Sequence, residues 1–489
     1  MFGASQTPRI YGVNSRWFWK GVLVKMLKRF KEKFIGDKDF YKLVLMVATP
    51  MMIQNGITNF VSLLDNIMVG QLGTEQMSGV AIVNQLMMVF NISIFGAVSG
   101  ASIFSAQFYG KGDHEGVRNA FRFKMVSCLL FAVLGIVIFL AAGPVLIELF
   151  LNDGSAESVA LTHQFGMEYL MVSIIGMIPF TLSQVYSSTL RETGETIVPM
   201  VAGVVAVFVN LVFNYLLIFG NFGFPQWGVA GAAVATLLSR IVETIIVIVW
   251  THTHSEKNIF IQGAYRNFKI PAALAKQILV KGTPLLINEA LWSGGMATLT
   301  QCYSMRGLDA VAAINISSTV SNLFNVVFLA LGSSIAIIVG QQLGSGELEK
   351  AVDTDRKIIF FSTFACFVMG TIMIFAAPLF PAIYNTSEHV KDYATSIIRI
   401  AACFMPFYSY YHATYFTLRS GGKTFVTFLF DSVYLWVIMI PVAYGLSRFT
   451  SIPLVPMYLL CQCSEIFKAV VGTVLVVKKV WVNNIVEEM

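Results

Sequence analysis

Residues 49–73 read TPMMIQNGITNFVSLLDNIMVGQLG, and this stretch decides the fold class. It is predominantly apolar and, counted from Tyr41, exceeds the roughly 20 residues that a helix needs to cross a bilayer. It nevertheless contains Asp65, and a carboxylate costs roughly 2.5–3.5 kcal/mol to insert at the bilayer centre. The stretch therefore predicts a transmembrane helix whose acid has either a partner or a function.

Composition extends this prediction to the whole chain. Of its 489 residues, 56% are hydrophobic and 12% are charged, and the mean hydropathy is +0.71. In soluble proteins a single hydrophobic core stops growing well below this size. We therefore expect an all-α integral membrane protein. The six cysteines lie within apolar runs, and we interpret them as small buried apolar residues rather than as disulfides or metal ligands.

Charged and Gly- or Pro-rich breaks divide the chain into twelve predicted transmembrane helices. Their approximate spans are 41–70, 77–108, 122–150, 160–188, 195–219, 228–252, 272–304, 310–342, 356–384, 391–418, 423–447 and 453–479. Residues 41–252 are predicted to form an N-terminal six-helix bundle and residues 272–482 a C-terminal one, joined by a cytoplasmic linker at 253–271. Residues 1–40 form a basic cytoplasmic extension, and residues 483–489 form a cytoplasmic tail.

The basic residues predict the orientation in the membrane. Twenty-five Lys and Arg lie in residues 1–42 and in the alternate breaks that follow, whereas the opposite breaks hold only Arg306, Lys391 and Arg448. The positive-inside rule then places both termini in the cytoplasm. The net charge of +6 reflects this asymmetry and does not indicate nucleic-acid binding. Residues 17–34 interleave aromatic and basic side chains, which predicts either a helix on the anionic leaflet or a solvated basic tail.

The chain repeats itself at an offset of 234 residues. Thr49-Pro50 then aligns with Thr283-Pro284, and 14 of the 74 positions from 49 to 122 are identical. The halves are therefore homologous, and six helices in each half make them parallel repeats, related by an axis along the membrane normal. Two similar bundles with a cleft between them suit alternating access better than a channel or an inert scaffold.

These motifs resemble the multidrug and toxic compound extrusion (MATE) family. The quoted stretch, followed by QFYGKGD at 107–113, is similar to the opening of the family, and GTPLLINEALWSGG at 282–295 is similar to its repeat. TLRETGET at 189–196 and TLRSGGKT at 417–424 match the family's turns after helices 4 and 10. The resemblance implies twelve helices in two bundles around a central cavity, and antiporters that export organic, often cationic, compounds against inward Na⁺ or H⁺ flow.

Asp65 is the first candidate for ion coupling. No basic residue lies three or four positions away on its helix, so it must face the bundle interior, water or a bound cation. The resemblance matches it to the family's acid on helix 1. Asn210 and Asn214 stand one turn apart on helix 5, where part of the family carries Asn and Asp; we assign them to the same site, which includes any Na⁺ bound at Asp65.

Substrate contacts are predicted mainly in the second half. Glu289 lies near mid-depth on helix 7, and the resemblance matches it loosely to a family glutamate that binds the substrate cation or the coupling ion. Tyr408 stands where some relatives carry an aspartate. Together with Trp292 and Tyr411 it can stack on a flat cation, although aromatic residues of this kind also serve as core.

The first helix supplies the remaining predicted cavity residues. Met51 and Met52 suit an adaptable apolar surface, and Gln54 follows them in the same motif. Asp431 lies inside helix 11 without a partner on its own helix and is a candidate gate residue. By contrast, two acids have a base three residues away, and we predict the pairs Arg240–Glu243 and Glu465–Lys468 to be structural.

The combined prediction is a cation-coupled efflux antiporter of the plasma membrane that works as a monomer among membrane lipids on small-molecule substrates. The sequence has no phosphate-binding loop, ATPase module or catalytic set, so we predict no enzyme activity and no cofactor beyond Na⁺ or H⁺. The alternative is a flippase for a lipid or a lipid-linked oligosaccharide with related two-bundle architecture. A flippase requires a strongly cationic cavity, whereas the intramembrane cations here are few.

Overall fold

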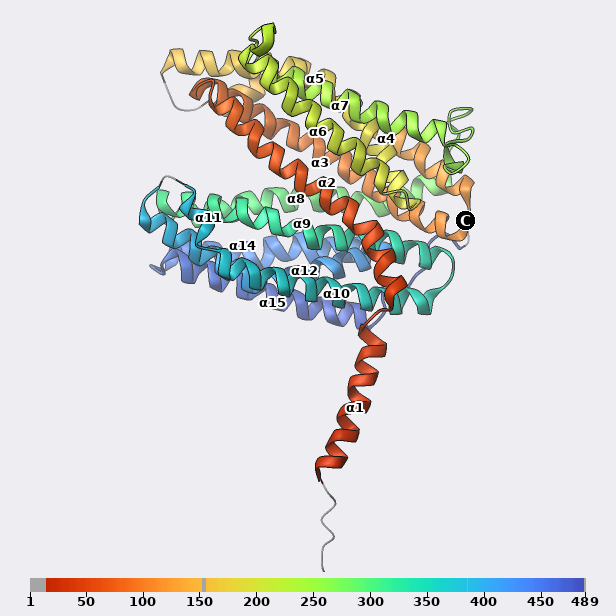
Figure 1. Ribbon diagram of the computed structural model, residues 1–489. Helices are drawn as coiled ribbons and strands as arrows, with labels where there is room; N and C mark the ends of the chain where they lie inside the picture. The colour runs from red at the N-terminus through yellow and green to blue at the C-terminus, as the bar shows by residue number, and fades with distance from the viewer. Residues whose placement is uncertain (1–14, 152–154, 385, 488–489) are drawn as a thin grey trace, which may run out of the picture.

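A computed structural model describes residues 15–151, 155–384 and 386–487 of the chain. Within these ranges it contains helices and no strand, and twelve membrane-length helical segments form two bundles that lie side by side (Figure 1). Residues 1–14 of the predicted basic extension lie outside the described residues.

The two bundles contain six long helical segments each. The first bundle comprises α2 (Lys38–Gly70), α3 (Thr74–Lys111), α4 (His114–Glu148), α5 (Ala156–Glu192), α6 (Ile197–Phe219) and α7 (Gly228–Thr253). The second comprises α8 (Ala272–Ser304), α9 (Leu308–Gly344), α10 (Leu348–Ala376), α12 (Glu388–Ser420), a segment from Thr424 to Phe449, and α15 (Leu454–Val477). Short helices η1 (Asn221–Gly223), η2 (Ile259–Ile261) and α11 (Leu379–Ala382) lie in the connections.

The predicted span 423–447 corresponds to one membrane-length segment, Thr424–Phe449. This segment is not a regular α-helix throughout. It runs as α13 (Thr424–Phe428), two π-helical turns (Leu429–Val433 and Leu435–Met439) and α14 (Ile440–Phe449). A proline at position 441 begins α14, and proline cannot donate to the carbonyl one turn earlier and clashes with it. The wider π turns accommodate this interruption, and the first of them carries Asp431.

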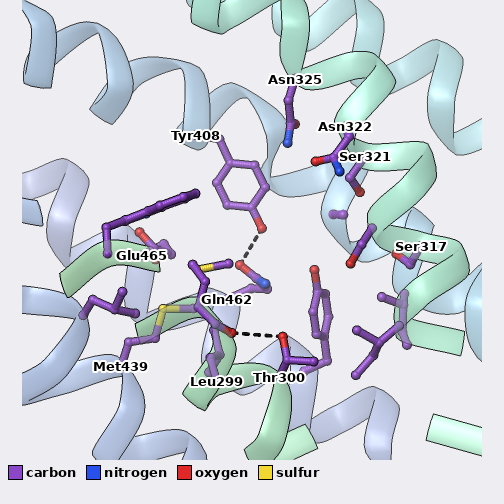
Figure 2. A pocket seen from close by; sticks show the side chains of 18 of the residues that line it. Leu299, Thr300, Ser317, Ser321, Asn322, Asn325, Tyr408, Met439, Gln462 and Glu465 are labelled. Carbon is purple, nitrogen blue, oxygen red and sulfur yellow. Dashed lines mark hydrogen bonds between the residues drawn. The ribbon is translucent and has the colours of Figure 1, made fainter. Parts of the chain in front are cut away.

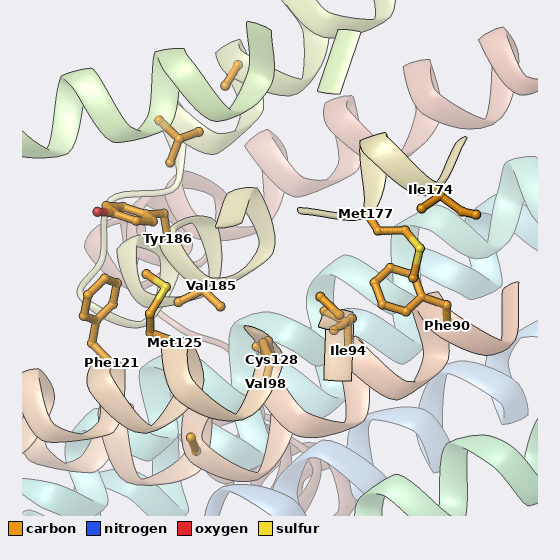
Figure 3. Close-up of a cluster of buried hydrophobic side chains, with 14 of the residues drawn as sticks. Phe90, Ile94, Val98, Phe121, Met125, Cys128, Ile174, Met177, Val185 and Tyr186 are labelled. Carbon is orange, nitrogen blue, oxygen red and sulfur yellow. The ribbon is translucent and has the colours of Figure 1, made fainter. Parts of the chain in front are cut away.

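The first bundle is held together by a continuous apolar core between α3, α4 and α5 (Figure 3). Its members include Phe90, Ile94, Val98, Phe121, Met125, Cys128, Ile174, Met177, Val185 and Tyr186. Cys302, Cys366 and Cys461 are buried in the second bundle, but Cys403 and Cys463 are exposed, so the expectation that all six cysteines are buried is wrong. These two lie on outward helix faces, where apolar residues of a membrane protein also belong.

The bundles exchange the ends of two helices. Val44, Val47 and Met51, near the start of α2, are buried in the core of the second bundle. Leu274 and Ile278, near the start of α8, are buried in the core of the first bundle. These contacts lie at the end of the molecule where α2 begins and where the C-terminus lies, which we call the basic end because most Lys and Arg gather there (Figure 1).

Two repeat-related glutamines join the bundles at the basic end. Gln107 at the end of α3 donates to the carbonyl of Ser420 in the second bundle (2.9 Å), and Gln341 at the end of α9 donates to the carbonyl of Glu192 in the first (2.7 Å). Helix packing is equally close there, because a Cβ on Gly110 would lie 1.8 Å from the carbonyl oxygen of Gln341. The interface between the bundles at the basic end, which we call the seam, therefore contains a bridging glutamine from each half.

Residues 478–487, which we call the C-terminal strap, cross this seam. Gln107 donates to the carbonyl of Asn483 (3.2 Å) and accepts from the amide of Ile485 (2.8 Å). Trp481 is 1% exposed and packs in the core of the second bundle, whereas Val486 is 0% exposed and packs in the core of the first. The strap is therefore anchored in both bundles at once, and it includes the described part of the predicted tail at 483–489.

The helix α1 (Ser15–Phe34) projects away from both bundles at their basic end (Figure 1). Its last turns contact the second bundle, since the rings of Phe30 and Phe34 lie 5.5 and 5.6 Å from that of Phe360 on α10. The predicted helical character of residues 17–34 is present in the structure, while their position on a membrane surface stays a prediction.

Candidate functional site

The three predicted ion-coupling residues meet inside the first bundle. Asp65 projects from α2, and Asn210 and Asn214 project from adjacent turns of α6. The amide nitrogen of Asn214 donates to Asp65 Oδ1 over 2.7 Å. Of the two orientations of the Asn210 amide, one satisfies its hydrogen bonds better. In that orientation its oxygen accepts from Thr236 (3.3 Å), and its nitrogen lies 2.9 Å from each carboxylate oxygen of Asp65. The Asp65 carboxylate is thus held by two neutral amides.

A polar cavity of 260 Å³ opens onto this carboxylate. Its walls include Asp65, Asn84, Tyr169, Asn214 and Thr236, which come from five different helices of the first bundle. Asn84, Tyr169 and Thr236 were not predicted as site residues. Their signal in the sequence is weak, because an isolated polar residue on an apolar helix does not indicate which bundle interior it faces.

The nearest described cation is already engaged. Arg240 lines a neighbouring 130 Å³ cavity that shares Asn84, Tyr169 and Thr236 with the first. Its guanidinium bonds Glu243 (3.2 Å) and lies 5.1 Å from the ring centroid of Phe180. The predicted Arg240–Glu243 pair is therefore confirmed. Among the described residues, no salt bridge joins Asp65 to a basic side chain.

One buried acceptor beside Asp65 has no hydrogen-bond partner among the described residues. It is Asn214 Oδ1, in a side chain that is 2% exposed. A buried carbonyl oxygen without a donor is costly, by roughly 1–3 kcal/mol. A hydrogen-bond donor or a small cation that reached this oxygen would satisfy it.

The second bundle encloses another polar cavity, of 230 Å³ (Figure 2). Four predicted residues line it: Trp292, Tyr408, Tyr411 and Asp431. The Tyr408 hydroxyl donates to Gln462 (2.5 Å) across the cavity, as Figure 2 shows. A polar wall that was not predicted comes from α9, and its members are Ser317, Ser321, Asn322 and Asn325.

Two acids line this second cavity, and one of them, Asp431, is neutralised by a lysine. Lys468 Nζ lies 2.7 Å from Asp431 Oδ1, and Asn288 donates to the other carboxylate oxygen (3.1 Å). The predicted pair Glu465–Lys468 is therefore wrong. Spacing along one helix suggests partners only on that helix, whereas Lys468 reaches from α15 to the π turn that carries Asp431. Glu465 Oε2 has no hydrogen-bond partner among the described residues, although the Glu465 carboxylate interacts electrostatically with Lys468.

The aromatic side chains around this ion pair contact the ammonium group of Lys468. The Lys468 ammonium lies 4.3 Å from the ring centroid of Tyr411 and 5.5 Å from that of Phe430. Such positions over a ring face are electrostatically favourable. Tyr411, predicted to stack on a substrate cation, thus contacts Lys468 in this structure.

The remaining predicted substrate residues lie apart from these cavities. Glu289 accepts a long hydrogen bond from Tyr415 (3.4 Å) on the face of α8 next to Asn288. Gln54 accepts from Arg191 (3.0 Å) within the first bundle. Met51 is buried at the seam, and Met52 packs against the core of the second bundle there. The structure therefore does not gather the predicted substrate residues into one pocket.

Comparison with known proteins shows which sequences this chain is similar to. The family model described as MatE matches residues 50–216 and 284–445, one segment in each bundle, and the two segments begin 234 residues apart, at 50 and 284. The "Probable multidrug resistance protein NorM" of Thermotoga maritima is 27% identical over 435 residues, covering 88% of this chain and 91% of that protein.

Solved structures show the same fold. A structure described as the "outward-facing conformation of a multidrug resistance MATE family transporter of the MOP superfamily" matches with a TM-score of 0.82 and 21% identity, covering 91% of this chain and 96% of that one. A MOP superfamily transporter from Pyrococcus furiosus matches with a TM-score of 0.81 and 21% identity, covering 92% and 97%. The all-α, two-bundle, twelve-helix prediction is confirmed.

Proposed function

The chain belongs to the MatE family, and from this premise we propose that it is a secondary antiporter of the plasma membrane. It exports organic compounds, cationic or amphipathic, in exchange for inward Na⁺ or H⁺, as a monomer and without a further cofactor. The multidrug-resistance names of its relatives support the substrate class.

The observation that carries this proposal is the state of Asp65. Its carboxylate is bonded by Asn214 (2.7 Å) and opens onto a polar cavity, without an ion pair among the described residues. A buried charge with neutral partners is stabilised by any small cation that reaches it. The free oxygen of Asn214 adds a second contact for that cation. Asn210 turns its amide nitrogen toward Asp65, so it holds the carboxylate and does not bind the cation.

The contacts between the bundles at the basic end support alternating access. We assign the basic end to the cytoplasm, by the positive-inside rule. The bundles are then closed on the cytoplasmic side by Gln107, Gln341 and the C-terminal strap. Opening inward breaks these contacts, and loading Asp65 with a cation supplies the free energy that shifts the equilibrium between the two arrangements.

The flippase alternative is less well supported. A cavity for a phosphorylated lipid needs free cations, but Arg240 is bonded to Glu243 and Lys468 to Asp431. The arginine and the lysine that line these cavities and the one beside them thus each have an acid within 3.2 Å. This pairing favours the antiporter.

The test is transport by purified protein in liposomes loaded with ethidium, an organic cation. An imposed Na⁺ gradient and an imposed pH gradient are applied separately, with empty liposomes as the control. We expect one gradient to drive dye movement and Asp65→Asn to abolish it. Dye movement under neither gradient, together with movement of a fluorescent phospholipid between leaflets, would replace the proposal with the flippase.

A further inference from the structure

A further cavity lies outside these polar sites, at the basic end of the second bundle. Its volume is 510 Å³, within the range of about 300–1,000 Å³ that is typical of small-molecule pockets. Residues of α10, α12 and α15 form its floor, α1 closes one side, and the C-terminal strap closes another. We call it the basal groove.

The interior of the basal groove is apolar. Ile359 and Phe360 of α10, Val476 and Val477 of α15, and Trp481 of the strap line it. Val477 is 72% exposed, as expected for a side chain in contact with lipid. The groove is therefore built to accept hydrocarbon rather than a polar ligand.

Three cations surround this apolar interior. Lys33 comes from α1, Arg356 from α10 and Lys479 from the strap, and all three line the groove. Arg356 is held in place by Asp353 (2.5 Å) and by donating to the carbonyl of Lys33 (2.9 Å), which ties α1 to the second bundle. Positive φ at Lys479 (53°) marks the sharp turn from α15 into the strap.

The one acid that lines the groove is shielded from a ligand at the rim. Asp355 is 1% exposed, and its carboxylate accepts from Thr417 (2.5 Å). Arg356 is already paired with Asp353, so the free positive charge of the groove comes from Lys33 and Lys479, beside an apolar floor. This pairing of features matches one class of molecule, an amphiphile with an anionic head.

We propose that the basal groove binds one anionic phospholipid from the leaflet that surrounds the basic end. The phosphate lies against Lys33 and Lys479, and an acyl chain lies along Phe360 and Val476. The bound lipid thereby joins α1 and the C-terminal strap to α10. This inference goes beyond the antiport and does not depend on it, because the binding is measured without transport.

The experiment uses the full-length protein in detergent, titrated with phosphatidylglycerol, phosphatidylcholine or inorganic phosphate, with bound lipid counted by native mass spectrometry. We expect one tightly bound phosphatidylglycerol, weaker phosphatidylcholine and no effect of phosphate. The double variant Lys33→Ala/Lys479→Ala should weaken phosphatidylglycerol roughly 25-fold, from about fivefold per surface cation. Lys276→Ala, at an exposed position near the start of α8, is the matched control and should change nothing.

A second variant tests the apolar floor. Thr363→Trp fills the groove while leaving all three cations in place, and it should abolish the tight lipid without increasing phosphate binding. Equal affinity for the two lipids, or unchanged affinity in the double lysine variant, would overturn the proposal. Lys33 and Lys479 are exposed, so we expect the double lysine variant to fold. Its lipid affinity therefore tests the proposal even if Thr363→Trp does not fold.

Discussion

The two bundles descend from one repeat, yet each surrounds its acid differently. In the first, the Asp65 carboxylate is held by the neutral amides of Asn210 and Asn214. In the second, the Asp431 carboxylate forms a salt bridge of 2.7 Å with Lys468, which is packed against Tyr411. A carboxylate held by amides remains open to an added cation, whereas one held by an ammonium already has its countercharge. The first bundle thus holds a buried carboxylate without a countercharge, and the second holds one that a lysine neutralises.

Removing the acid of each bundle gives the sharpest test of this difference. Asp65→Asn keeps the shape and hydrogen bonding of the side chain but removes its charge, so we expect gradient-driven dye efflux to fall to the background of empty liposomes. Asp431→Asn should retain gradient coupling. Equal loss in both variants, measured in proteoliposomes at matched protein incorporation, would mean that the two sites act alike.

Removing the ammonium of the second site should damage folding rather than coupling. Lys468→Met leaves Asp431 buried without its countercharge, which costs about 3–5 kcal/mol of stability when a buried pair is broken. Thermal unfolding in detergent measures this. Adding Asp431→Asn to Lys468→Met should recover most of the loss, and failure of the double variant to recover would assign the damage to lost packing around Tyr411 instead.

Weakening the amides of the first site should lower cation affinity without abolishing turnover. Asn214→Ala removes both the donor to Asp65 and the free oxygen beside it. Removing a supporting partner of an ion ligand typically costs about 10–100-fold in affinity. We therefore expect the half-saturating concentration of the coupling ion to rise by that factor in dye-efflux assays. Asn66→Ala, on the same cavity wall, is the control and should change it little.

The smallest effects are expected at the seam, where the bundles are alike. Gln107→Ala and Gln341→Ala each remove hydrogen bonds that are worth about 1 kcal/mol net apiece. Each variant should raise the reaction rate of a cysteine placed at Ser420 with a membrane-impermeant maleimide, by a few-fold. The increase should be larger for Gln107, because this residue also holds Asn483 and Ile485 of the strap. A larger increase for Gln341 would contradict the anchoring role of Gln107.

The fold was predictable because its signals are long and repeated. Apolar runs with basic breaks locate the helices, and the offset of 234 residues locates the two bundles. The cluster of Asp65, Asn210 and Asn214 was predictable for a related reason: one-turn spacing puts both amides on one face, and the family resemblance suggested that this face meets helix 1.

Contacts between helices without such spacing were not predictable. Lys468 has an acid three positions before it, so the sequence favours Glu465, while its partner Asp431 depends on a π turn that no local pattern indicates. Of the strap, residues 478–482 were predicted as the end of the second bundle and the rest as part of a cytoplasmic tail at 483–489. Its order comes from Gln107 and from burial of Trp481 and Val486, which are properties of the assembled bundles.

The strap also sets the order in which the molecule can be completed during biosynthesis. Translation runs from the N-terminus, so residues 478–487 leave the ribosome after all twelve helices have been made. Both halves are therefore made before the strap exists, and until then the exchanged ends of α2 and α8 and the bonds of Gln107 and Gln341 to the opposite bundle are what join them. A truncation just before Trp481 would yield a chain with every membrane span in place but without the anchors at Trp481, Ile485 and Val486.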